Sequence, residues 1–165
     1  MSATMSLFWI IYFLLAAIVM LSLVPQRNIV RLLPFGIVGG AAVAAIIQII
    51  AVWYLRLWRF NFTDLAAYRG IPIFLVLSWL PLMIIFANWL LTLPAGTGRF
   101  FYITGFALAS VGIEYILLRT RFMVHMNWSI VRTALLALAL HFLLAWYLLA
   151  VRPGVEETKI HLLKR

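Results

Sequence analysis

The chain has 165 residues, of which 67% are hydrophobic and 10% are charged, and its mean hydropathy is +1.12. Soluble domains are roughly half apolar and a quarter charged, so this composition excludes a soluble globular domain and indicates an integral membrane protein. The formal net charge of +9 comes from basic residues near the ends of apolar segments. Basic residues in these positions are typical of contacts with anionic lipid headgroups, so we expect membrane lipids, and no nucleic acid, as partners.

Five apolar segments are each long enough to cross a bilayer core, which needs roughly 20 apolar residues. They predict an all-α integral membrane bundle of five transmembrane helices, in one domain over residues 1–150, followed by a polar tail over residues 151–165. The predicted spans cover residues 6–24, 32–55, 71–93, 100–118 and 133–150. The connections between them are short, which leaves no room for a soluble catalytic domain.

The second predicted helix carries small residues on one face. Gly36, Gly40 and Ala44 recur every four residues, a spacing that lets another helix backbone approach closely in lipid. Gln48 lies one turn further along the same stripe. We expect its side chain to form a hydrogen bond across a helix interface.

The connection after the second helix, residues 56–70, mixes arginines with aromatic residues, a composition typical of headgroup depth. Thr63 suits the N-cap of a helix and Gly70 suits its C-terminal stop. These features predict a short interfacial helix between the second and third spans, lying on the membrane surface.

The fourth predicted helix carries a second stripe of small residues, formed by Gly105, Ala109 and Gly112. Two such stripes in one chain favour close packing of the helices that carry them. We therefore expect the second and fourth helices to make the closest helix contact. The same faces could also pack against a second copy of the chain or a partner in a membrane complex.

Arginines at the ends of the predicted helices are candidates for lipid-headgroup contacts. They are Arg56, Arg59, Arg119, Arg121 and Arg132. Lysines and arginines divide almost evenly between the two sides of a five-span bundle, seven against six, so their bias does not set an orientation.

Glu114 lies inside the fourth apolar segment, where a carboxylate costs several kcal/mol unless it is protonated, paired or able to reach water. One interpretation is an interfacial salt bridge with Arg121, which would share the face of Glu114 if the helix continued. The other is a pair with His141 of the fifth helix, which must run antiparallel to the fourth. Such a pair would form a proton-sensitive element inside the bundle.

Catalytic and cofactor motifs are absent from the sequence. There is no HExxH, GxSxG or glycine-rich phosphate loop, and no second buried carboxylate for an acid-base dyad. Only His141 is placed deep enough for haem ligation, without a second histidine at comparable depth. We predict no cofactor, no metal and no catalytic residue, and an enzyme is the least favoured class.

The stretch "IEYILLRTRFMVHMNWSIVRT", residues 113–133, combines an acid at the end of a span, a basic connection and a His/Asn-Trp pair before the next span. This layout resembles an uncharacterised family of small multi-pass membrane proteins from spore-forming Gram-positive bacteria. The resemblance implies a bacterial cytoplasmic membrane and no particular activity.

Three functions remain open on the sequence. The first, which the sequence favours, is an accessory, scaffolding or assembly subunit without catalytic activity. The second is a small proton- or ion-linked transporter or channel that uses Glu114 and His141, with Gln48 as a further polar group inside the membrane. The third is an enzyme that modifies a lipid or polyisoprenoid.

Overall fold

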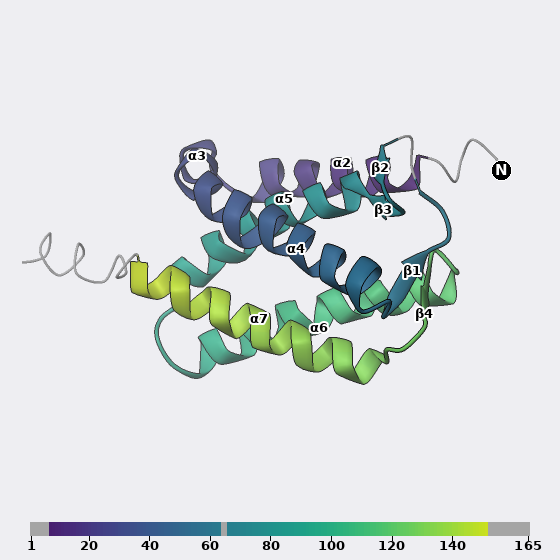
Figure 1. The fold of residues 1–165 in the computed structure, drawn as a ribbon. Helices are drawn as coiled ribbons and strands as arrows, with labels where there is room; N and C mark the ends of the chain where they lie inside the picture. The colour runs from purple at the N-terminus through teal and green to yellow at the C-terminus, as the bar shows by residue number, and fades with distance from the viewer. Residues whose placement is uncertain (1–6, 64–65, 152–165) are drawn as a thin grey trace, which may run out of the picture.

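The computed structural model describes residues 7–63 and 66–151, and this part of the chain is mostly helical. Successive helices run in opposite directions, so that α3 and the end of α7 lie at one end of the bundle and β1 and β4 lie at the other (Figure 1). The helical segments are α2 (Phe8–Leu23), α3 (Gln26–Phe35), η1 (Gly36–Ala42), α4 (Val43–Ile49), η2 (Ile50–Tyr54), α5 (Ile73–Thr92), α6 (Thr97–Arg119) and α7 (Ile130–Val151).

Four helices in the described residues are long and apolar enough to cross a membrane: Gln26–Tyr54, Ile73–Thr92, Thr97–Arg119 and Ile130–Val151. The helix α2 is also apolar but has 16 residues, or about 24 Å at 1.5 Å per residue. The all-α bundle predicted from the sequence is therefore confirmed. The predicted tail lies outside the described residues except for Val151.

The second helical segment is continuous from Gln26 to Tyr54 and begins before the predicted residue 32. Pro25 occupies its N-cap, where the missing N–H costs nothing, so the proline starts this helix as well as ending α2. In the first turns the arginines are exposed while Leu32 and Phe35 are buried. The amphipathic pattern explains why residues that look like a polar connection are helical.

The helix α5 lies at the centre of the bundle, and its contacts explain the first small-residue stripe. A methyl group added to Gly40 would lie 2.5 Å from the carbonyl oxygen of Trp79, and one added to Gly36 would lie 2.8 Å from a side-chain carbon of Ile84. Ala44 is buried next along the stripe. The stripe therefore serves close helix packing, as predicted, but its partner is α5.

The second stripe of small residues, on α6, remains exposed. Gly105, Ala109 and Gly112 are exposed, and a methyl group added to either glycine would meet nothing within 4 Å. The prediction that the second and fourth helices make the closest contact is wrong. The opposite face of α6 turns inward instead and packs against α7, so the stripe remains on the outside.

Two small antiparallel sheets replace the predicted interfacial helix in the described part of residues 56–70. Strand β1 (Trp58–Phe60) pairs with β4 (Met123–His125), and β2 (Ala67–Tyr68) pairs with β3 (Ile71–Pro72). Along β1, buried aromatic residues flank an exposed arginine, which is the two-residue period of a strand. Gly70, with φ of +83°, lies in the turn between β2 and β3.

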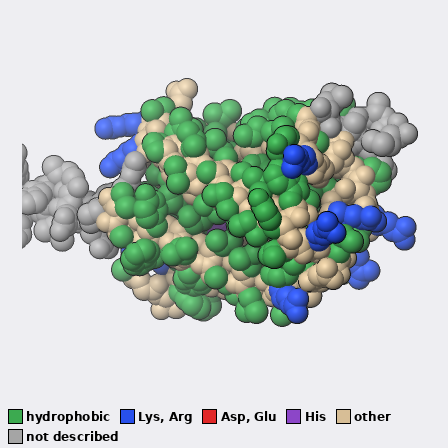
Figure 2. Space-filling model, viewed as in Figure 1, with side chains coloured by type: hydrophobic (Ala, Val, Ile, Leu, Met, Phe, Trp, Pro, Cys, Tyr) green, Lys and Arg blue, Asp and Glu red, His purple; other side chains and the backbone are tan. Residues whose placement is uncertain are grey.

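An aromatic cluster ties α2 to the strand-bearing end of the bundle. Trp9 is fully buried, its indole N–H donates to the carbonyl of Phe62 at 2.9 Å, and its ring meets Phe60 and Phe122 edge-on. Figure 2 shows apolar side chains covering most of the visible face, with arginines toward its two ends.

Candidate functional site

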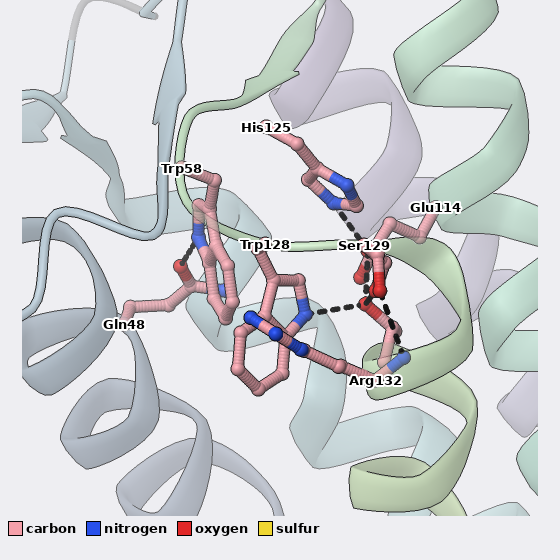
Figure 3. A network of polar contacts seen from close by, with 8 residues as sticks. Gln48, Trp58, Glu114, His125, Trp128, Ser129 and Arg132 are labelled. Atoms are coloured by element: carbon pink, nitrogen blue, oxygen red, sulfur yellow. Dashed lines mark hydrogen bonds and ion pairs between the residues drawn. The ribbon is translucent and has the colours of Figure 1, made fainter.

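Glu114 is the only acidic residue in the part of the chain that the structure describes. It lies five positions before the end of α6, and 18% of its side chain is exposed. Its Oε1 atom accepts a hydrogen bond from the Thr133 hydroxyl at 2.6 Å and lies 2.9 Å from Nε2 of His125 (Figure 3). The carboxylate is therefore held between α6, the first turn of α7 and strand β4.

The polar network continues beyond Thr133. The indole N–H of Trp128 donates to the Thr133 hydroxyl oxygen at 2.8 Å, which leaves the hydroxyl proton for Glu114. Strand β4 sets the position of His125, because its pairing with β1 places His125 directly opposite Trp58. The site thus depends on contacts between two connections that are far apart in the sequence.

The predicted salt bridge between Glu114 and Arg121 is wrong. The helix ends at Arg119, and Arg121 adopts a left-handed backbone conformation with φ of 61°. Its side chain is exposed, and its carbonyl accepts a hydrogen bond from Asn61. Because the helix does not continue, Arg121 does not share the face of Glu114, and His125 takes the expected place.

The predicted pair between Glu114 and His141 is also wrong as a direct contact. His141 is 3% exposed and lies eight residues beyond Thr133 on α7, which corresponds to about 12 Å along the helix. Its Nδ1 lies 2.7 Å from the carbonyl of Ala137, and its buried Nε2 has no hydrogen-bond partner among the described residues. Three aromatic rings, of Trp79, Phe86 and Phe106, surround the imidazole with centroids 5.5–6.2 Å away.

A cavity of about 120 Å³ nevertheless brings the three predicted polar residues together. Gln48, Glu114 and His141 all line it, with Trp58 and Trp79 among the other lining residues. A second cavity of about 220 Å³ shares Gln48, Trp79, Ser110 and Glu114 with the first and is also lined by Tyr12, Phe60 and Phe106. Neither cavity is lined by a described lysine or arginine.

Gln48 has a hydrogen-bond partner that the sequence did not reveal. Its Oε1 accepts from the indole N–H of Trp58 at 2.9 Å, so it reaches across to strand β1 and not to another helix (Figure 3). The bond fixes the amide at the cavity wall and holds the strand over it.

The five predicted headgroup arginines are all exposed and belong to the end of the bundle that carries β1 and β4. Arg119 folds over the ring of Tyr115, with its guanidinium 5.2 Å from the ring centroid, and donates to the tyrosine hydroxyl. Arg132 lies 5.9 Å over the ring of Trp128. Arginines beside aromatic rings suit an interfacial position, and their contact with lipid remains a prediction.

Three members of the network were not predicted from the sequence: His125, Trp128 and Thr133. His125 falls in a connection and Thr133 at a helix start, positions that predict solvent exposure when each segment is considered alone. The available signal was the alternation of aromatic and polar residues from Trp58 to Phe62, because this two-residue period indicates a strand, which needs a partner strand.

Comparison of the chain with protein families, characterised proteins and solved structures gave no match. The resemblance to small membrane proteins of spore-forming bacteria therefore remains a prediction. Among the described residues no group of three or more histidine and acidic side chains could hold a metal ion.

Proposed function

We propose that the protein is a multi-pass integral membrane protein that acts as a small proton- or ion-linked transporter, with Glu114 and His141 in its binding cavity. The observation that carries this proposal is the position of Glu114, an acid at the wall of a cavity between apolar helices. An ionisable group in such a position is costly, and it commonly marks an ion or substrate pathway. A second polar group, His141, lines the same cavity deeper in the bundle.

The membrane location rests on the lengths and outer faces of the helices. In addition to the four long helices, α2 exposes a row of large apolar residues, including Ile11, Leu15 and Ile18. Water would not favour these faces, whereas lipid tails would. A fifth crossing by α2 requires local thinning of the bilayer, which costs only fractions of a kcal/mol per Å. We propose five crossings, in the cytoplasmic membrane of a bacterium.

Flux measurements on proteoliposomes test the transport function. The purified protein should carry protons or monovalent cations across the vesicle membrane, and Glu114→Gln should abolish this flux because it removes the charge and keeps the shape. Arg121→Gln is the matched control, since it also removes one charge near the same helix end but outside the network. Vesicles that show no flux of protons or cations with the wild-type protein would overturn the transporter proposal.

An accessory or assembly subunit is the second candidate, and the exposed stripe on α6 favours it. Gly105 and Gly112 have open space beside them and Ala109 is exposed between them, so another helix could pack on this face. Because the chain has no cysteine, Gly105→Cys gives a single reactive site. In native membranes this variant should form a disulfide-linked dimer or a crosslink to a partner, whereas Leu143→Cys, on the exposed face of α7, should not. Equal crosslinking at both positions would contradict a specific interface.

A further inference from the structure

We propose that the cavity binds an organic ammonium ion, an amine with an apolar body; this inference rests on the proposed function of the cavity as a binding site. The two adjoining cavities, of about 120 and 220 Å³, offer room for a small molecule and not only for a bare ion. Their lining supplies negative charge, aromatic faces and unused hydrogen-bond acceptors.

The charge of the lining selects a cation. Glu114 lines both cavities, and neither is lined by a described lysine or arginine. Both hydrogen bonds to the carboxylate end on Oε1, and no described residue donates to Oε2. An anionic ligand would meet this carboxylate with no lysine or arginine beside it, and His125, which pairs with Glu114, lines neither cavity, whereas an ammonium group could donate to Oε2.

The walls favour an organic cation over a metal ion. Sodium or potassium binding needs several oxygen ligands to replace water, and most lining residues are apolar. Trp58 and Trp79 line the first cavity, and Tyr12, Phe60 and Phe106 line the second. Aromatic faces attract ammonium groups, and apolar walls accept the hydrocarbon part of an amine.

The deep end of the first cavity adds a second acceptor. His141 Nδ1 lies 2.7 Å from the Ala137 carbonyl, so it carries the proton and donates. Its buried Nε2 is then an acceptor that receives no hydrogen bond from any described residue. Buried polar atoms are rarely left without a partner, so an unsatisfied acceptor at the cavity wall points to a ligand that donates hydrogen bonds.

Equilibrium binding to the full-length protein in maltoside micelles tests the inference with phenethylammonium as the probe. The neutral analogue 2-phenylethanol has nearly the same shape and an O–H in place of the charged group. We expect phenethylammonium to bind at least tenfold more tightly than 2-phenylethanol, and Glu114→Gln to remove this preference. Arg121→Gln should keep it.

Several results would overturn the ammonium assignment. They are equal affinity for the amine and the alcohol, an amine affinity unchanged by Glu114→Gln, or tighter binding of sodium or of the anion 3-phenylpropanoate. If Glu114→Gln does not fold, as judged by its thermal transition, Trp79→Leu replaces it and should weaken the amine more than the alcohol.

The binding and flux experiments distinguish an error in the proposed ligand from an error in the proposed transport function. Amine binding that depends on Glu114, without flux in proteoliposomes, would contradict transport and retain the ammonium site. Proton or cation flux that depends on Glu114, without amine binding, would retain transport and overturn the ammonium site.

Discussion

The two small-residue stripes of this chain have similar spacing and opposite roles. Gly36 and Gly40 lie against the backbone and side chains of α5, while Gly105 and Gly112 face outward with open space around them. The helix α5, which receives the first stripe, is also more buried than α6, which bears the second. In the most apolar stretch of each helix, 56% of the α5 residues are buried but only 17% of the α6 residues. A small-residue stripe therefore indicates a face that permits close approach, and the neighbouring helix decides whether the approach occurs.

The helix α6 is joined to the bundle in another way. Its inward face carries Glu114, and the hydrogen bond from Thr133 connects this residue to the first turn of α7. The helix Gln26–Tyr54 is thus held against α5 by close packing of its glycine face. The helix α6 is held to α7 in part by the hydrogen bond between Thr133 and Glu114. Substitutions at these two kinds of contact test the comparison.

The largest effect is expected for Gly40→Ala. The added methyl group would lie 2.5 Å from a backbone oxygen of α5, which cannot move without displacing the helix. Overpacking of this kind costs about 2 kcal/mol in the free energy of unfolding. Unfolding in mixed micelles of maltoside and dodecyl sulfate, followed by circular dichroism, measures the loss. Unchanged stability would mean that the two helices are not in close contact.

Thr133→Val should have the next largest effect. Valine has nearly the same shape as threonine, but it leaves the Trp128 indole without an acceptor and Glu114 without one donor. The expected loss is about 1.5 kcal/mol in the same assay. Thr92→Val is a matched control, because the Thr92 hydroxyl is exposed and bonds only to a carbonyl one turn back. A loss of equal size in both variants would argue against a specific polar link between α6 and α7.

A smaller loss, about 1 kcal/mol, is expected for Gly36→Ala. Its added methyl group would lie 2.8 Å from a carbon of the Ile84 side chain, which can rotate away in part. The double variant Gly36→Ala with Ile84→Val should lose less stability than the sum of the two single changes, because valine lacks the Cδ1 atom that would lie 3.0 Å from the new methyl group. A double variant less stable than the sum of the two single changes would contradict this explanation.

The smallest effect is expected for Gly105→Ala, within about 0.5 kcal/mol of the unchanged protein, because the added methyl group meets nothing within 4 Å. Size-exclusion chromatography with light scattering, run beside the unfolding assay, distinguishes lipid exposure from a partner. A clear loss of stability together with a change in oligomeric state would show that the second stripe also packs, against a second copy of the chain.

The sequence predicted several residues of the site but not the contacts that they make. Gln48, Glu114 and His141 stand out in the sequence because polar side chains are rare in apolar segments, and all three line one cavity. Their partners did not stand out. His125 and Trp58 meet Glu114 and Gln48 only because β1 and β4, more than 60 positions apart, pair at one end of the bundle.

The sequence by itself determined the apolar helical bundle, including, among its five predicted spans, the four helices long enough to cross a membrane, and the faces that admit close packing, because length, hydropathy and helical spacing are local properties. Only the tertiary structure decided that the first glycine stripe meets α5, that the second remains exposed, and that Glu114 contacts His125 in place of Arg121 or His141. These outcomes depend on the rotation of each helix about its axis and on the backbone hydrogen bonds between connections. Neither is fixed by residues close together in the chain.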